Sequence, residues 1–290
     1  MNKPKATFAL SNRIAVVFDF DETLTPEDSF QSLLRDLDLD ADKFESEHIQ
    51  PLLDQGWEKY LARAYCLVKE SHQRNDKITK DRLAQVGQNI TLYDGTQGLF
   101  SSLQDTIKAV SPEIELEFYL ISGGFVDISR NAAIAKDFKC MWGCEFHYTE
   151  TDEIDFIKAQ MTHIEKTRYL YYLSKGIDTQ NEKDLVYSYQ DIPDNELHVP
   201  LDQVIYIGDG ASDIPCFTVM KEYGGVAIGI YPRDSDPSKW KYLEHVSSSQ
   251  RLSNLVPASY EKDSELMRSL SLSVEYIAKK IALRQMSFGE

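Results

Sequence analysis

The sequence predicts an α/β protein in which an open parallel sheet has helices on both faces and carries a small inserted α-helical cap. Four short apolar runs, each bounded by Asp, Gly or Ser, alternate with amphipathic helical stretches, at 14–18, 116–121, 204–207 and 226–230. Such alternation is typical of parallel strands that are buried on both faces and joined by helical crossovers. After the first run, roughly sixty residues show only helical patterning, which is too long for a simple connection between neighbouring strands.

The remaining elements follow in chain order. We expect a core domain formed by residues 1–25 and 92–290, and a helical cap formed by residues 26–91. Within the cap, apolar residues recur at helical spacing: Phe30, Leu33, Leu34 and Leu37, then Tyr60, Leu61, Tyr65 and Leu67. The turn signal at 92–95 opens a helix through Leu103, and a cluster of aromatic and thiol residues at 140–146 predicts a fifth strand.

The last predicted helix, 261–284, has apolar residues at steps of three and four: Leu266, Leu270, Val274, Ile277 and Ile281. This pattern favours packing against the core, with a dimer contact as the alternative. Both a monomer and a homodimer remain open.

Composition limits the possible partners. The chain has 47 acidic and 31 basic residues and a formal net charge of -16. A surface so negative repels nucleic acid and anionic membranes, so we expect neither as a partner. The four cysteines are too few and too scattered for a disulfide framework, and the spacing of Cys140 and Cys144 does not match a zinc site. Because no apolar run reaches the length of a membrane span and no leader cleavage site follows the first run, we expect a cytoplasmic protein.

Acidic and hydroxyl side chains follow the predicted strands at one edge of the sheet. Asp19 and Asp21 come after the first strand, Ser122 after the second, and Asp209 and Asp213 after the run at 204–207. In an open parallel sheet, ligands bind outside these carboxyl ends. Clustered carboxylates repel one another unless a hard divalent cation neutralises them, and a small set of oxygen ligands suits Mg²⁺.

These segments resemble the four motifs of the haloacid dehalogenase superfamily. The chain most resembles its phosphoserine-phosphatase-like branch, in which a helical cap lies between the first two motifs. The matching segments run in order from about residue 14 to 229: Asp-Phe-Asp-Glu-Thr at 19–23, Ser-Gly-Gly at 122–124, Lys166, and Gly-Asp-Gly-Ala-Ser-Asp at 208–213. The resemblance implies a Rossmann-like core and a Mg²⁺-dependent phosphatase that acts on a small phosphorylated metabolite, similar to phosphoserine or phosphocholine.

The resemblance also implies a role for each matching residue. Asp19 would be the nucleophile that forms an aspartyl-phosphate. Asp21 would be the general acid and base, and its backbone carbonyl would face the metal. Ser122 and the amide of Gly123 would hold phosphate oxygens.

Three further roles concern charge. Lys166 would neutralise the nucleophile and the transferring phosphoryl group, although other basic residues lie on the same predicted helix. Asp209 would bind the metal directly with Asp19 and Asp21, and Asp213 would hold either a metal-bound water or Lys166. The chain departs from the family pattern at Glu22, where Ser or Gly is common, and at Ser212, where the phosphoserine branch usually has Asn.

Substrate recognition is expected in the cap. Glu27 and Asp28 lie just after the first motif, where they would meet a cationic group such as an ammonium or a choline. They also fit a helix start with Thr25 as the cap and Pro26 in the first helical position. Arg63 would bind a substrate carboxylate, although other arginines of the cap compete for this role.

Other functions share this fold. A phosphotransferase or a protein phosphatase would use the same residues, and the sequence does not separate them from a metabolite phosphatase. Dehalogenation or phosphonate cleavage needs no acid for an alcohol leaving group, so Asp21 argues against both. A catalytically silent binding protein predicts that at least one motif is eroded, and all four are intact.

Overall fold

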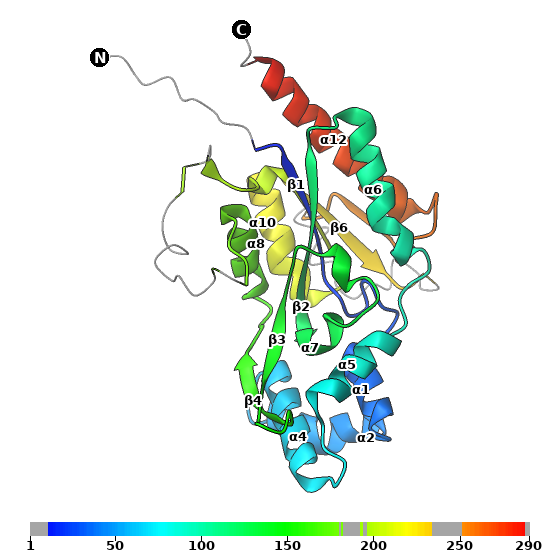
Figure 1. Cartoon of the computed structure of the whole chain (residues 1–290), viewed down its shortest axis with the longest axis vertical. Coiled ribbons are helices and arrows are strands. Elements are labelled where there is room, and N and C mark those ends of the chain that lie inside the picture. Colours follow the sequence, from blue (N-terminus) through cyan, green and yellow to red (C-terminus); the bar gives the residue numbers. More distant parts are fainter. Residues whose placement is uncertain (1–10, 180, 182–191, 194–195, 234–250, 288–290) are drawn as a thin grey trace, which may run out of the picture.

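A computed structural model describes residues 11–179, 181, 192–193, 196–233 and 251–287 of the chain (Figure 1). Its sheet has seven strands in the order β4-β3-β2-β1-β5-β6-β7. All pairs are parallel except β3 with β4. The strands are β1 (Arg13–Phe18), β2 (Glu115–Phe125), β3 (Cys140–Tyr148), β4 (Ile154–Ala159), β5 (Val204–Gly208), β6 (Val226–Tyr231) and β7 (Asn254–Pro257).

The predicted fold class is confirmed. The four apolar runs form β1, β2, β5 and β6, and the expected fifth strand is β3. The sequence did not predict β4 or β7. Parts of the predicted core domain, including residues 1–10 and 234–250, lie outside the described residues.

Both faces of the sheet are covered. Ile14, Val16 and Phe18 of β1 face one apolar cluster, while Ala15 and Val17 face the other, and all five side chains are buried. Because each face meets helices, the strand reads as an unbroken apolar run rather than as an alternating one.

Within the described residues, α6, α8, α10 and α12 contribute to these layers. On one face, α6 packs against β2, and α12 packs against α6, β1 and β7; on the other face, α10 packs against β5, β6 and α8 (Figure 1). The five apolar residues predicted for the last helix are buried in the cluster beneath α12, which confirms the core-packing expectation. The bounds are α6 (Thr96–Val110), α8 (Lys166–Lys175), α10 (Ile214–Tyr223) and α12 (Glu265–Ser287). None of the described helices combines the length and the apolar character that a membrane crossing needs.

Residues 29–89, here named the helical insert, lie between β1 and α6 at the lower end of Figure 1. Its helices are α1 (Ser29–Asp36), α2 (Ala41–Phe44), η1 (Glu45–Ile49), α3 (Gln50–Leu53), α4 (Lys59–Gln73) and α5 (Lys80–Asn89). The expected helix start is wrong by three residues. Asp28, not Thr25, caps α1 by accepting from the amide of Phe30 at 2.9 Å. The hydroxyl of Thr25 instead donates to the backbone carbonyl of Glu27 at 2.7 Å.

The β3–β4 hairpin extends from the sheet to the helical insert. The amide of Ile154 donates to the carbonyl of Ile78 at 2.9 Å, and the amide of Lys80 donates to the carbonyl of Asp152 at 2.9 Å. The insert is therefore attached to the sheet by this hairpin as well as by its own two chain connections.

Two short helices connect strands close to the sheet. They are α7 (Val126–Ser129) and η2 (Ala135–Asp137), and both lie between β2 and β3. The helical turns η4 (Leu201–Gln203) and η5 (Ala211–Asp213) flank β5.

Candidate active site

Asp19 follows the central strand β1 and is 4% exposed. Phe18 is paired in register with Leu120 of β2 and with Ile207 of β5, and the pairing of β1 with both strands ends there, at one edge of the sheet. One oxygen of Asp19, Oδ1, accepts from the amide of Phe20 at 2.7 Å. The other, Oδ2, lies 2.7 Å from Nζ of Lys166.

Lys166 is the first residue of α8 and is 1% exposed. Its ammonium group donates to Asp19, to Oδ1 of Asp213 at 2.7 Å and to Oγ of Ser212 at 3.1 Å. All three hydrogens of the ammonium thus have acceptors, which is the condition under which a buried lysine can remain charged. Of the lysines on the predicted helix, Lys166 is the one that the structure brings to Asp19.

Asp213 holds Lys166 with a carboxylate that also accepts hydrogen bonds from other groups. Besides Lys166, it accepts from the hydroxyl of Tyr206 at 2.6 Å and from the amide of Gly210 at 3.2 Å. A side chain at Gly208 would place its Cβ 2.3 Å from Cγ of Asp213, so only glycine leaves room for the carboxylate there. Of the two expected roles of Asp213, the contact with Lys166 is therefore present.

Three carboxylates are suitably placed for a cation. Asp19, Asp209 and Asp213 each offer an oxygen, and these oxygens lie within 4.8 Å of one another. Asp209 also accepts from the hydroxyl of Thr23 at 3.5 Å. A small set of carboxylate oxygens fits Mg²⁺ better than a soft metal. The side chain of Asp21 is not part of this group, and its metal contact through the backbone carbonyl stays a prediction.

Asp21 faces the C-terminal end of β2. Its Oδ1 accepts from the amide of Ser29 at 2.8 Å, and a Cβ on Gly124 would lie 2.3 Å from its Oδ2. Ser122, at 1% exposure, accepts from the amide of Gly124 at 3.0 Å. The structure thus brings the first and second motifs together, with Asp21 directly over the second.

The next residue in the first motif, Glu22, has a positive φ of 56°. This left-handed conformation favours glycine, which is one of the residues common at that position in the resembled family.

Burial shifts the pKa values of these acids upward. Burial, opposed by Lys166 and reinforced by Asp213, raises the pKa of Asp19 to about 6. Burial and the nearby Asp28 raise the pKa of Asp21 to about 8, so Asp21 can carry a proton near neutral pH. Although burial alone lowers the pKa of Lys166, the charges of Asp19 and Asp213 raise it well above the usual range.

Two residues that were predicted to bind the substrate pair with other side chains of the protein. Glu27 forms two hydrogen bonds with Arg35, at 2.9 and 2.7 Å, and accepts a third from Ser32. Arg63 is 6% exposed, lies over the ring of Phe30 and pairs with Asp28 at 2.7 Å. Their roles in substrate binding therefore stay predictions.

One residue near the motifs was not predicted as part of the site. Tyr60 extends from α4 to Gly123, where a Cβ would lie 2.3 Å from the tyrosine hydroxyl. The sequence showed Tyr60 only as part of an apolar helical pattern, because its approach to Gly123 depends on how the helical insert packs on the core.

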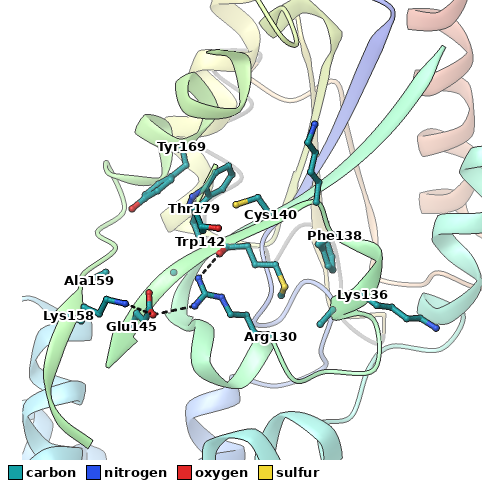
Figure 2. A pocket seen from close by; sticks show the side chains of 14 residues that line it. Arg130, Lys136, Phe138, Cys140, Trp142, Glu145, Lys158, Ala159, Tyr169 and Thr179 are labelled. Atoms are coloured by element: carbon teal, nitrogen blue, oxygen red, sulfur yellow. Dashed lines mark hydrogen bonds and ion pairs between the residues drawn. The ribbon is translucent and has the colours of Figure 1, made fainter. Parts of the chain in front are cut away.

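A cavity of about 830 Å³ lies elsewhere, along β3 (Figure 2). Arg130 and Lys158 flank Glu145 there, at 3.4 and 2.8 Å, and the ring of Tyr169 forms part of the wall. Among the described residues, none of those predicted for catalysis, metal binding or substrate binding lines this cavity. It is separate from the carboxylate cluster.

Sequence comparison finds a distant relative of the chain. No family model matches the chain. An uncharacterized protein of Borreliella burgdorferi is 24% identical in an alignment of 295 positions that covers 91% of this chain and 98% of that protein.

Three solved structures share the architecture at low sequence identity. A HAD family hydrolase from Salmonella enterica serovar Typhi gives a TM-score of 0.54 at 17% identity, covering 87% of this chain and 69% of that one. A probable phosphoserine phosphatase from Vibrio cholerae gives 0.55 at 11% identity, with coverages of 94% and 69%. The cytosolic 5′-nucleotidase IIIB bound to cytidine gives 0.52 at 16% identity, with coverages of 94% and 90%.

The chain therefore has the fold of the haloacid dehalogenase (HAD) superfamily. Structures of phosphoserine phosphatase also match, with TM-scores of 0.50, so the fold is of the phosphoserine-phosphatase-like type. This confirms the resemblance at the level of fold.

Proposed function

We propose that the protein is a Mg²⁺-dependent phosphatase that hydrolyses a phosphate monoester through an aspartyl-phosphate on Asp19. The observation that carries the proposal is the contact of the buried Asp19 carboxylate with Lys166, 2.7 Å away, inside a group of three carboxylates. A carboxylate that attacks a phosphate dianion needs local positive charge, because the overall charge of -16 repels the substrate.

The reaction divides into two displacements. An oxygen of Asp19 attacks phosphorus while the bond to the leaving oxygen breaks, and Asp21 donates its proton to that oxygen. Asp21 then takes a proton from water, whose oxygen attacks phosphorus and breaks the bond to Asp19, releasing orthophosphate. Ser122 and the amide of Gly123 orient the phosphoryl oxygens, and Lys166 offsets their charge.

The metal site follows from the donor set. Asp19, Asp209 and the backbone carbonyl of Asp21 would hold Mg²⁺, and Asp213 would position Lys166 beside it. When bound, the ion screens the repulsion between the attacking carboxylate and the phosphoryl group and stabilises charge on the phosphoryl oxygens.

The proposed substrate is a small phosphorylated metabolite, and the proposed setting is the cytoplasm. Residues 26–91 would act as the cap that selects the leaving group, since the core residues contact only the phosphate and the metal. Transfer of the phosphoryl group to another alcohol is the nearest alternative, because either water or an alcohol can attack the phosphorus of an aspartyl-phosphate.

Turnover of p-nitrophenyl phosphate tests the proposal. We expect activity with Mg²⁺ that is abolished by EDTA and by Asp19→Asn, and retained in Asp105→Asn, the same chemical change at an exposed position on α6. Comparable activity in Asp19→Asn would contradict the nucleophile, and EDTA-resistant activity would contradict the metal. Product analysis with and without an acceptor alcohol separates hydrolysis from transfer. A screen of phosphorylated metabolites and phosphopeptides, ranked by kcat/KM, identifies the substrate class.

A further inference from the structure

The first turn of α4 is held in place by the side chain of Glu58. Glu58 caps this helix by accepting from the amides of Tyr60 and Leu61, both at 3.0 Å. The same carboxylate accepts from the side-chain amide of Gln160 at 3.0 Å, from the segment between β4 and α8. The position of Tyr60 is thus set by a helix cap and by a contact with the core side of the molecule.

The ring of Tyr60 reaches over the C-terminal end of β2. Any side chain at Gly123 would collide with it, because a Cβ there would lie 2.3 Å from the hydroxyl oxygen and 2.4 Å from Cζ. The other side of the ring meets His163 edge-on, with centroids 6.2 Å apart. The absent side chain of Gly123 therefore leaves space that a tyrosine hydroxyl from the helical insert occupies.

This hydroxyl is a donor that lacks an acceptor. Within the part of the chain that the structure describes, no hydrogen bond is made by the Tyr60 hydroxyl, although Lys166, Asp19 and Asp21 are close enough to act on its pKa. Burial raises that pKa well above the usual range, so the group stays protonated. Tyr60 is half-buried, and its hydroxyl is not one of the fully buried polar atoms without a partner. The donor is therefore available to a ligand oxygen that binds beside Gly123.

We propose that the Tyr60 hydroxyl donates a hydrogen bond to a phosphoryl oxygen of the substrate, beside the oxygens held by Ser122 and Gly123. The inference rests on the proposed phosphatase function and deepens it. The helical insert would then contact the group that all substrates share, in addition to the leaving group by which they differ. Phosphate binding would hold α4 against the second motif.

The test is Tyr60→Phe, which keeps the ring and its contact with His163 but removes the donor. A hydrogen bond to a charged group is worth about 1.5 to 3 kcal/mol, so kcat/KM should fall about tenfold to a hundredfold. The fall should be equal for p-nitrophenyl phosphate and for an alkyl phosphate, because the lost contact is to the phosphoryl group. The matched control is Tyr65→Phe on the same helix, where the tyrosine is 47% exposed and no loss is expected.

A binding measurement gives a readout apart from turnover. Calorimetric titration of orthophosphate in the presence of Mg²⁺ should show an affinity weakened by a similar factor in Tyr60→Phe and unchanged in Tyr65→Phe. Thermal unfolding of each variant checks that the fold is retained. Unchanged kcat/KM and unchanged orthophosphate affinity in a folded Tyr60→Phe protein would overturn the inference. A loss confined to one leaving group would also overturn it, since that pattern assigns Tyr60 to the leaving group.

The two proposals fail in different ways. Wild-type turnover that Asp19→Asn abolishes, together with an unaffected Tyr60→Phe variant, refutes the Tyr60 contact and leaves the phosphatase intact. A wild-type protein that neither turns over phosphate esters nor binds orthophosphate refutes both.

Discussion

Lys166→Met removes the buried cation that links Asp19 to Asp213. Methionine is close to lysine in length and unbranched, so it fills the volume without the charge. With all groups ionised, the three clustered carboxylates and Lys166 carry a net charge of -2, and the variant carries -3. Bound Mg²⁺ would bring these sums to 0 and -1. The substitution should therefore destabilise the metal-free protein more than the Mg²⁺-bound protein.

The structure sets the size of this effect. Lys166 and both of its carboxylate partners are at most 6% exposed in their side chains, so solvent does little to screen the unpaired charges. Removing one partner of a buried ion pair costs about 3 to 5 kcal/mol. For a protein of this size, that corresponds to a fall in Tm of roughly 5 to 8 °C. Protonation of Asp19, whose pKa is raised to about 6, limits the loss at lower pH.

Thermal and urea unfolding, each with EDTA and with saturating Mg²⁺, measure the effect. Lys158→Met is the matched control, because the Lys158 side chain is 58% exposed and its ion pair should contribute less than about 1 kcal/mol. We expect Mg²⁺ to stabilise Lys166→Met more than it stabilises the wild type. A Lys166→Met protein as stable in EDTA as Lys158→Met, or an equal Mg²⁺ response in wild type and variant, would refute the reasoning.

Two further predictions concern other acids. Asp21→Asn should lower kcat/KM for an alkyl phosphate about 10²- to 10⁴-fold in steady-state assays. The loss should be much smaller for p-nitrophenyl phosphate, because its leaving group departs without a proton. Equal losses for the two substrates would contradict the role of Asp21 as the general acid. Burial alone raises the pKa of Glu117, but hydrogen bonds from His198, Lys139 and Tyr119 lower it from 4.5 to about 2. Its stabilisation is therefore complete above pH 4.5 and is lost as the pH falls toward 2. In urea unfolding, Glu117→Gln should lower the free energy of unfolding by about 2 kcal/mol at pH 7, and by less as the pH falls to 3. A difference in stability that stays constant with pH would contradict this.

The sequence predicted those elements whose physical cause is local. Strands buried on both faces must be apolar throughout, so β1, β2, β5 and β6 were visible as runs. By contrast, β4 is a partly exposed edge strand in which Asp155, Phe156 and Lys158 are largely outside the core, so it lacks such a run. The four-residue β7 ends in Pro257 and is too short to give a pattern.

At the candidate site, motif order predicted which residues converge, because the carboxyl ends of parallel strands share one edge. The motifs did not predict which charged side chains pair with one another. Asp28 was expected to meet a ligand or the helix dipole, and it both caps α1 and pairs with Arg63, 35 residues away. Likewise, Glu27, just before α1, pairs with Arg35 in the last turn of that helix. Such pairings depend on the packing of the helical insert, which no local pattern encodes.

The β3–β4 hairpin has a mechanical consequence for the lysine of the site. Its tip is bonded to the helical insert through Ile78 and Lys80, and its return strand leads through residues 160–165 directly into Lys166. The helical insert cannot rotate away from the sheet about its two chain connections alone. The hairpin must move with the insert, or the hydrogen bonds to Ile78 and Lys80 must break. The same six-residue segment connects the hairpin to α8, so a displacement of the insert would also act on the position of Lys166.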